Sequence, residues 1–418
     1  MKKKFDELLK GWKVESLNNI GELQYGYTCS AINKNTGIKL LRITDINKNG
    51  KVIWETVPYC EVSKNDYEKY KLNIGDVLFA RIGATTGKTA FVEKEVKGVF
   101  ASYLIKFKPT HKELDTKFLY YFTQSNPYWI QVHKNKEGQL KKGLNAKVLG
   151  NIALSLPPLP EQKKIAEILS TVNQGIEKVD EAIKKTKRLK NGLMQELLTK
   201  GIGHKEFKDT EIGRMPKEWK LEKISDIAEV KGGKRLPKGH QLVDFKTPYP
   251  YIRVVDFRNM GVNTGDIKFL LPETQRLIKQ YTISSKDVYI SIAGTVGISG
   301  LIPSELDGAN LTENSAKFCN LRDIIKEYLA YILNSPIGQN QISAYIGKAQ
   351  QPKLALFRIE KVKVPLPLLQ EQQKIAEILS SVDERLELLR KRKERLERVK
   401  KGLMNDLLTG RKRVRLEA

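Results

Sequence analysis

The chain contains one helical block twice, and this repeat constrains its fold more than any other feature. Residues 161–170 read EQKKIAEILS and residues 371–380 read EQQKIAEILS, an offset of 210 residues (371 − 161). The blocks KNGLMQELLTKG at 190–201 and KKGLMNDLLTG at 400–410 have the same offset (400 − 190). An offset that stays constant means that nothing is inserted between the two blocks, as a continuous helix requires.

Apolar residues within each block follow a helical period. They step by four and three residues, which is the pattern of a heptad seam. Prolines precede each block, and Gly201 and Gly410 follow the two blocks, as expected for helix starts and stops. Because each seam needs a partner, we expect the two helices to pair antiparallel. The interface residues predicted for this pair are Ile165, Leu169, Val172, Ile176, Leu193, Ile375, Leu379, Val382, Leu386 and Leu403.

Two pairs of equivalent residues stand out within the seams. Lys190 and Lys400 share one position, where a lysine sets the register or extends its charged end to solvent. Gly192 and Gly402 share another, and paired glycines predict a close approach of the two backbones. The alternative, two unrelated surface helices, does not account for a repeat at the level of single residues.

The segments between the helical blocks repeat more faintly. Trp12-Lys13-Val14-Glu15 echoes Trp219-Lys220-Leu221-Glu222, and each segment ends in a strand-like alternation that leads into its long helix. The fold class predicted is α+β: two globular β-rich domains separated by two long α-helices that form an antiparallel coiled coil, with an internal pseudo-two-fold repeat. The boundaries expected are 1–156 for the first domain, 157–203 for the central helix, 204–366 for the second domain, and 367–418 for the distal helix and basic tail.

The charge balance indicates the class of partner. The chain has 74 Lys and Arg against 48 Asp and Glu, a net charge of +26. A surplus of this size favours a polyanionic partner, and nucleic acid is the first candidate. A lysine-rich thermophilic surface is the alternative, but such surfaces also gain glutamate, and here the charges do not balance.

Other features limit the compartment and the chemistry. Cys29, Cys60 and Cys319 form no CxxC pair, so we expect free thiols in a reducing compartment. The four histidines show no metal-ligand spacing. The N-terminus lacks the apolar core of a signal peptide, and no stretch approaches the ~20 apolar residues of a membrane span. We therefore expect a cytoplasmic protein with no membrane partner and no bound metal.

Two motifs resemble catalytic or nucleotide-binding loops but depart from them. GATTGKT at 83–89 has three residues between its glycines where a P-loop has four, so we interpret it as a turn between strands. Asn126-Pro127-Tyr128-Trp129 resembles the catalytic loop of adenine-N6 methyltransferases but lacks one proline, and we interpret it as a helix terminator. With no Ser–His–Asp set and no convincing carboxylate pair, we predict no catalytic residue in this chain.

Loops in both domains carry side chains suited to DNA. Lysine and arginine neutralise phosphates, while arginine, lysine, asparagine and glutamine reach base edges. A solvated surface residue is the simpler interpretation of any single lysine, so the prediction concerns the loops as sets. The candidates are Gln24, Tyr25, Arg42, Arg81, Lys88, Gln139, Lys141 and Lys142 in the first domain, and Lys231, Lys234, Arg235, Lys238, Arg253, Arg258, Lys348, Gln350, Gln351 and Lys353 in the second.

The basic run at the C-terminus allows two interpretations. RKRKERLERVKK at 390–401 and RKRVR at 411–415 could contact phosphates between two half-sites. The same residues could instead form the outer face of a coiled coil.

The repeated blocks also resemble a known family. LPPLPEQKKIAEILS…NGLMQELLTKG and PLPLLQEQQKIAEILS…KGLMNDLLTG are similar to the central and distal helical repeats of Type I restriction–modification specificity (S) subunits. The two segments between them resemble that family's target recognition domains, so the resemblance covers essentially the whole chain. It implies that each domain reads one half of a split, asymmetric site in double-stranded DNA and that the helix pair sets the unread spacer.

The resemblance also implies a division of labour. The chain itself would be non-catalytic and hold no cofactor. Methyltransferase (M) subunits would carry S-adenosylmethionine, and a restriction (R) subunit would use ATP and Mg²⁺. The alternative is a non-catalytic coiled-coil assembly scaffold with incidental nucleic-acid binding, for which weak, salt-independent DNA binding would be expected.

Overall fold

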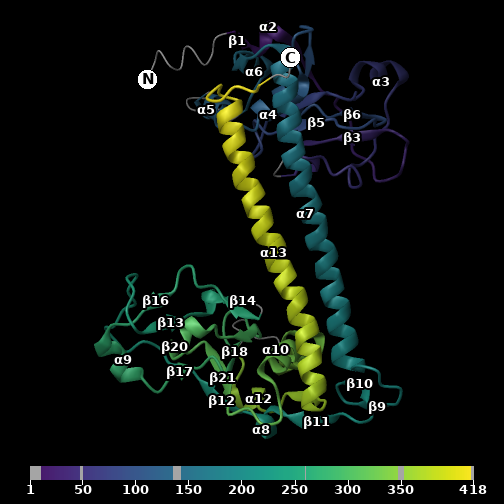
Figure 1. Ribbon diagram of the computed structural model, residues 1–418. Helices are drawn as coiled ribbons and strands as arrows, with labels where there is room; N and C mark the ends of the chain where they lie inside the picture. The colour runs from purple at the N-terminus through teal and green to yellow at the C-terminus, as the bar shows by residue number, and fades with distance from the viewer. Residues whose placement is uncertain (1–10, 48–49, 135–142, 259, 347–352, 416–418) are drawn as a thin grey trace. The chain divides into compact units, whose positions relative to one another are not determined.

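The computed structural model describes residues 11–47, 50–134, 143–258, 260–346 and 353–415 (Figure 1). The chain divides into two compact units. Unit 1 contains Met1–Asp180 and Lys391–Ala418, and unit 2 contains Glu181–Arg390. Each unit therefore combines one globular domain with about half of each long helix.

The two long helices predicted from the repeat are present. Helix α7 covers Leu159–Lys200 and helix α13 covers Leu369–Leu407. The two helices run antiparallel in unit 1, since Lys393 contacts Asp180 and Lys400 contacts Asn173 further toward the start of α7. The predicted pairing of the long helices is thus confirmed within this unit.

Both ends of the helix pair are built into domain cores. In unit 1, Ile165 and Leu169 of α7 and Leu407 of α13 pack among the buried residues of the first domain. In unit 2, Leu197 of α7 and Leu379 of α13 do the same in the second domain. Of the predicted interface residues, the buried ones are Ile165, Leu169, Ile176, Ile375, Leu379, Val382 and Leu386, and the half-buried ones are Val172, Leu193 and Leu403.

The domain of unit 1 is built on short strands. An antiparallel sheet has the order β2-β7-β4-β5, β3 pairs parallel with β6, and β1 pairs antiparallel with β8. The strands are β1 Lys13–Ser16, β2 Gly21–Tyr25, β3 Lys39–Leu41, β4 Val77–Ala80, β5 Thr89–Phe91, β6 Gly98–Phe100, β7 Leu104–Pro109 and β8 Ala153–Leu156. The helices are α2 Leu17–Ile20, α3 Lys64–Tyr70, α4 Thr116–Phe122, α5 Asn126–Lys134 and α6 Ala146–Gly150.

The domain of unit 2 follows the same plan. Its antiparallel sheet β12-β21-β18-β19 corresponds to β2-β7-β4-β5, and its parallel pair β13–β20 corresponds to β3–β6. The strands are β9 Phe207–Thr210, β10 Gly213–Pro216, β11 Lys220–Lys223, β12 Glu229–Gly232, β13 Pro250–Ile252, β14 Phe257–Arg258, β15 Gly261–Val262, β16 Lys268–Phe269, β17 Thr282–Ile283, β18 Val288–Ser291, β19 Ser299–Leu301, β20 Ala309–Leu311, β21 Ser315–Cys319 and β22 Lys363–Leu366. The helices are α8 Ile224–Ile227, α9 Pro272–Ile278, α10 Lys326–Asn334, α11 Pro336–Ile346 and α12 Leu356–Ile359.

The Trp-Lys-x-Glu echo of the sequence has a structural reason. The strand that follows each tryptophan, β1 or β11, pairs antiparallel with the strand that leads into the long helix, β8 or β22. The two ends of each globular domain are thereby joined at the start of its helix.

Two interpretations from the sequence were wrong. A Cβ atom placed on Gly192 or Gly402 would meet no atom within 4 Å, and both glycines are exposed, so they bring no backbones together. Asn126 does not terminate a helix, because α4 already ends at Phe122 and Asn126 is the first residue of α5. For the glycines, the sequence pattern marked a helix but did not show which side of it faces the interior. For Asn126, the pattern did not show that a second helix starts shortly after the first one ends.

Candidate nucleic-acid interface

Polar contacts fix the register of the long helices. In unit 2, Lys190 Nζ donates to both carboxylate oxygens of Asp383, at 2.6 and 2.7 Å, and the Tyr331 hydroxyl donates to the same carboxylate. In unit 1, the equivalent Lys400 donates to Asn173 Oδ1 at 2.8 Å. Burial lowers the pKa of Lys400, although the nearby carboxylates of Glu177 and Glu397 act in the opposite direction. Both seam lysines therefore have a register role, but only Lys190 donates its hydrogen bonds to a carboxylate.

A repeated Glu-Gln pair ties each domain to the start of its long helix. Gln162 is fully buried; its side chain donates to the carbonyls of Glu113 and Pro157 and accepts from the Asp115 amide. Gln372 makes the equivalent three contacts in unit 2. We did not single out these residues from the sequence, although their exact repetition in both blocks was a signal.

The C-terminal basic run has a role that neither sequence interpretation included. Arg413 donates to both carboxylate oxygens of the buried Glu161, and the guanidinium lies over the Trp12 ring. Lys412 pairs with Asp406. Arg413 thereby joins the segment after α13 to the start of α7 within unit 1.

In unit 1, three segments meet at the end of the antiparallel sheet where strands β2 and β4 finish. The Arg81 guanidinium lies 4.9 Å from the centre of the Tyr25 ring, and the Tyr25 hydroxyl accepts a hydrogen bond from the Ala146 amide at 2.9 Å. The Leu144 amide donates to the Arg81 carbonyl. The end of β2, the β4–β5 turn and the segment entering α6 thus form what we call the three-loop cluster.

Further candidates of the first domain border this cluster. Gln24 precedes Tyr25 on β2, and its amide donates to the Lys69 carbonyl. Lys88 is half-buried in the β4–β5 turn, which is also where GATTGKT lies, as the turn interpretation predicted. The candidates Gln139, Lys141 and Lys142 lie outside the described residues.

The domain of unit 2 has the same cluster with different side chains. The Leu354 amide donates to the Ile292 carbonyl, as Leu144 does to Arg81. Lys353 is exposed, and its backbone forms an isolated antiparallel β-bridge with Ala293 in the β18–β19 turn. On the end of β12, Lys231 is exposed and pairs with Glu229 at 2.7 Å. The candidates Lys348, Gln350 and Gln351 lie outside the described residues.

The loop after β12 is an accessible basic segment of unit 2. The Arg235 side chain is 79% exposed and reaches Glu313 at 2.8 Å. Lys234 and Lys238 are also exposed, and Lys234 Nζ lies 5.4 Å from the centre of the Tyr281 ring. Because these ends lie in solvent, they can exchange internal partners for phosphates or bases at little cost.

Arg42 and Arg253 are engaged inside their own domains. Arg42 donates through Nε and Nη2 to the buried Asp45, and Arg253 does the same to Asp256 and also contacts Asp266. These hydrogen bonds raise the pKa of both guanidinium groups. The bonds from Nε and Nη2 to one buried carboxylate therefore fix the orientation of each guanidinium group. Arg258 is exposed but donates to the carbonyls of Val255 and Phe257.

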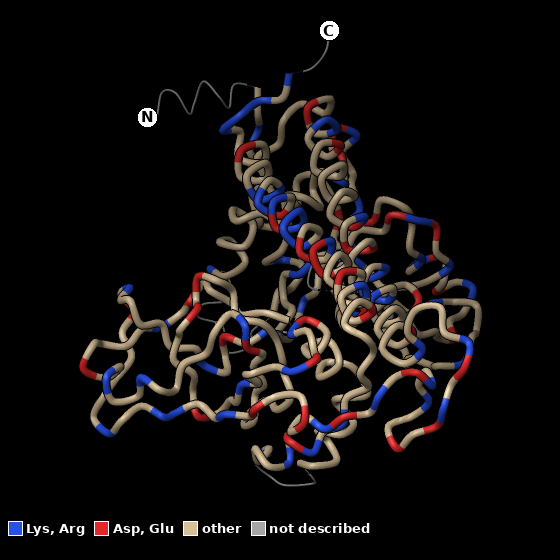
Figure 2. The backbone as a smooth tube through the Cα atoms, turned by 60° about the horizontal axis from the view of Figure 1, so that its bottom comes forward, with Lys and Arg blue, Asp and Glu red and all other residues tan. Residues whose placement is uncertain are grey.

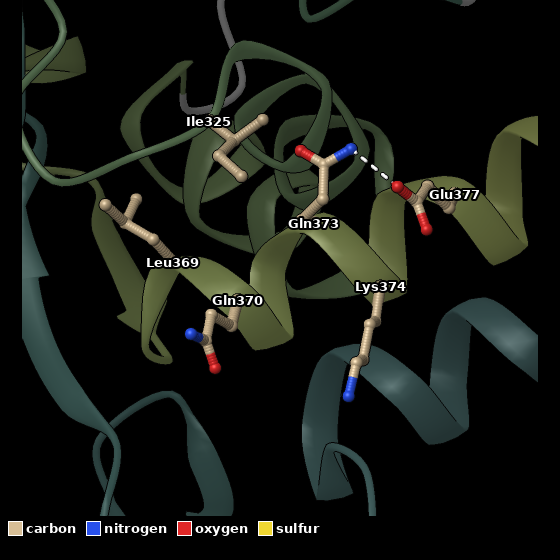
Figure 3. A pocket seen from close by; sticks show the side chains of 6 residues that line it. All are labelled: Ile325, Leu369, Gln370, Gln373, Lys374 and Glu377. Atoms are coloured by element: carbon tan, nitrogen blue, oxygen red, sulfur yellow. Dashed lines mark hydrogen bonds between the residues drawn. The ribbon is translucent and has the colours of Figure 1, made fainter.

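The surface carries mixed charge and open hollows. Figure 2 shows lysine and arginine spread over both units with acidic residues among them. An open hollow at the start of α13 is lined by Ile325, Leu369, Gln370, Gln373, Lys374 and Glu377 (Figure 3). Among the described residues, no group of three or more His, Cys, Asp or Glu side chains could hold a metal. Within the same residues, no helix is long and apolar enough to cross a bilayer.

Antiparallel helices bearing two domains of one plan, with unlike polar loops, define a duplicated nucleic-acid-reading scaffold. The family model of the Type I restriction modification DNA specificity domain matches residues 9–186 and 216–398. The chain belongs to this family. Its function is therefore DNA sequence specificity in a Type I restriction–modification complex, in which catalysis resides in the partner subunits.

Individual relatives agree with this membership. The chain is 30% identical to the Type I restriction enzyme MjaVIII specificity subunit of Methanocaldococcus jannaschii, over 82% of this chain and 80% of that protein. It is 29% identical to the putative type I restriction enzyme MjaX specificity subunit of the same organism, over 99% of this chain and 96% of that protein.

Solved structures share the fold. The Type-I restriction-modification system S subunit from M. genitalium superposes with a TM-score of 0.61 at 16% identity, covering 95% of this chain and 96% of that one. A chain from a structure of a type I R-M system, described by its complex assembly and conformational transition, gives a TM-score of 0.56 at 17% identity, covering 95% and 97%. The fold class and the family expected from the sequence are confirmed.

Proposed function

We propose that the chain reads a bipartite, asymmetric site in double-stranded DNA, with each three-loop cluster contacting one half-site. The observation that supports this most is that the clusters share a backbone plan but differ in side chains. Tyr25 and Arg81 in unit 1 correspond to Gly232 and Ile292 in unit 2. Unlike side chains on one framework are what two different half-sites require.

Roles within the clusters follow from geometry. Arg81 is held against an aromatic ring, which limits the entropy lost when the arginine forms two hydrogen bonds to a guanine. Arg235 and Lys234 are exposed, and we assign them to base or phosphate contacts in the second half-site. We assign phosphate contacts to Lys88, Lys238 and Lys353, whose positive charge carries no sequence information. We assign Gln24 and Lys231 to the edges of the clusters, and Arg42 and Arg253 to maintaining loop shape.

The domain assignment follows the same plan. We place the recognition domains at 1–156 and 204–366, and the spacer segments at 157–203 and 367–418. Both segments hold a long helix that starts within three residues of the proposed boundary.

The methyltransferase subunits need a surface that is alike in both units. The start of each long helix offers one: Leu369, Lys374, Glu377 and Ile378 of α13 border the hollow of Figure 3 or follow it. Their equivalents in α7 are Leu159, Lys164, Glu167 and Ile168, which are the same residue types and are exposed or half-buried. We propose that one methyltransferase subunit docks at each, because repeated surfaces suit two copies of one partner.

The remaining chemistry is assigned to the partners. We propose that S-adenosylmethionine is bound by the methyltransferase subunits and that ATP and Mg²⁺ are used by a restriction subunit. We also propose that the complex works in the cytoplasm, where the free thiols Cys29, Cys60 and Cys319 persist in reduced form.

A methylation map tests the proposal. The chain would be co-expressed with its methyltransferase subunit in a methylation-free host, and N6-methyladenine would be mapped by single-molecule sequencing. The expected result is one split, asymmetric motif with a fixed gap that disappears when this chain is omitted. An assembled complex that leaves no new methylation would contradict the proposal and favour the scaffold alternative.

A further inference from the structure

Two cross-helix pairs in unit 1 define the register of α7 against α13. Lys393 Nζ lies 2.7 Å from Asp180, and Lys400 Nζ lies 2.8 Å from Asn173. From the pair of Asn173 with Lys400 to the pair of Asp180 with Lys393, the residue number rises by seven on α7 (180 − 173) and falls by seven on α13 (400 − 393). The pair in unit 2, Lys190 with Asp383, has residue numbers that follow the same antiparallel register: ten higher than Asp180 on α7 (190 − 180) and ten lower than Lys393 on α13 (393 − 383).

The repeat offset shows that one of these pairs has diverged. With the offset of 210 residues, Asp180 is equivalent to Arg390 (390 − 180) and Lys393 is equivalent to Ile183 (393 − 183). The same register places Ile183 opposite Arg390 in unit 2. The two helices are therefore not interchangeable here: α7 carries aspartate and isoleucine where α13 carries arginine and lysine.

This difference matters for what a second copy of the chain would meet. If α7 paired with another α7 in the same register, Asp180 would face Ile183 at two places. The carboxylate would then lose solvent without gaining a partner. If α13 paired with another α13, Arg390 would face Lys393 at two places, and like charges at such positions oppose association.

The other repeated contact does not discriminate in this way. Lys190 and Lys400 are both lysine, so each can donate to either Asn173 or Asp383 in any combination of helices. Selection between partners therefore rests on the diverged positions. Asp180 and Lys393 are 37% and 31% exposed, so their interaction is only partly screened by solvent.

We propose that Asp180, Ile183, Arg390 and Lys393 form a pairing code that joins α7 to α13 and rejects a second copy of either helix. The code keeps two unlike domains on one helix pair, and it does not depend on which bases those domains read. Compared with one α7–α7 pair and one α13–α13 pair, two α7–α13 pairs gain two ion pairs and avoid two like-charge contacts. This favours the pairing of α7 with α13 on the order of tenfold to a hundredfold.

Fragment exchange on the full-length chain tests the code. A protease site is inserted in the β9–β10 turn, between Ile212 and Gly213, and the folded chain is cut there. Isotopically light and heavy batches are mixed in mild denaturant, returned to buffer and weighed by native mass spectrometry. We expect the cut wild-type chain to re-form only pairs of one N-terminal and one C-terminal fragment.

The variant Arg390→Asp should change this outcome. It would place a carboxylate opposite Lys393 at both positions of a C-terminal homodimer, so that species should rise roughly tenfold. Arg398→Asp makes the same change of charge at an exposed position on the far side of α13 and should leave the distribution unchanged. Statistical mixing in the wild type, or equal behaviour of the two variants, would overturn the proposal.

A second measurement needs no cleavage. In the intact chain, Lys393→Asp should lower the melting temperature, and adding Asp180→Lys should restore it, because the ion pair is remade with its charges exchanged. A double variant no more stable than the single one would show that the two side chains do not interact, and the pairing code would then fail.

Discussion

Arg413 and Glu161 form a two-pronged ion pair, with both donor–acceptor distances at 2.7 Å, across 252 residues of chain. Glu161 also accepts a hydrogen bond from the Trp12 indole. In unit 2, Glu371 accepts from the Trp219 indole and contacts His204 in the same way. The segment after α13 thus occupies in unit 1 the place that the segment after α7 occupies in unit 2.

The ion pair predicts that the last residues of the chain stabilise unit 1. Arg413→Ala would leave the Glu161 carboxylate, whose side chain is 3% exposed, without its cation. We expect the free energy of unfolding to fall by about 2 kcal/mol, measured by thermal or urea denaturation. Arg411→Ala, at an exposed neighbouring position, is the control. An equal loss in both variants would contradict a specific role for Arg413.

The seam lysines should differ in their effect on stability. Lys190→Met would strip Asp383 of its cation and should cost about 1–3 kcal/mol. Lys400→Met removes a half-buried charge whose hydrogen-bond partner is the neutral Asn173 and whose burial outweighs the attraction of Glu177 and Glu397, so it should be neutral or stabilising. Urea denaturation of both variants at neutral pH would measure the difference, and similar losses would contradict this account.

Lys400 should also leave a signature in the pH dependence of stability. Its pKa is lowered from 10.5, so between the lowered pKa and 10.5 the unfolded chain binds more protons than the folded chain. The contribution of Lys400 to stability therefore rises with pH through that window and is lost as the pH falls. The advantage of Lys400→Met over the wild type should shrink as the pH approaches 10.5. An advantage independent of pH would exclude the proposed cause.

The exposed loop after β12, which carries Lys234 and Arg235, should contact one half-site only. Lys234→Ala with Arg235→Ala should weaken DNA binding and alter the second half of the methylated motif, leaving the first half intact. Each lost base contact is worth about 1–3 kcal/mol of discrimination. Methylation mapping with the double variant measures this. Unchanged binding together with an unchanged motif would remove these residues from the interface.

Arg42 should affect the stability of the fold rather than the recognition of DNA bases. Arg42→Ala removes two hydrogen bonds to Asp45 and should lower the free energy of unfolding by about 1–2 kcal/mol. The methylated motif should keep its bases. A changed motif in a variant of unchanged stability would return Arg42 to the set of reading residues.

The repeat determined much of this protein from sequence alone. A constant offset and a heptad period are local properties of the chain, so they predicted two long helices, their order and their antiparallel pairing. They also predicted two domains of one plan. The duplicated Trp-Lys-x-Glu segment could be found in the sequence, but its pairing with the strand before each long helix could not.

Tertiary structure decided which polar side chains are engaged internally and which face solvent. Arg42 and Arg235 look alike in sequence, yet Arg42 is fixed by the buried Asp45 while the Arg235 side chain is 79% exposed. The seam pattern made Gly192 an interface residue, whereas the fold leaves it open to solvent. Periodicity records which residues share a helix face. Only packing between segments far apart in the chain determines what that face meets, because hydrogen bonds and burial depend on neighbours that the local sequence does not specify.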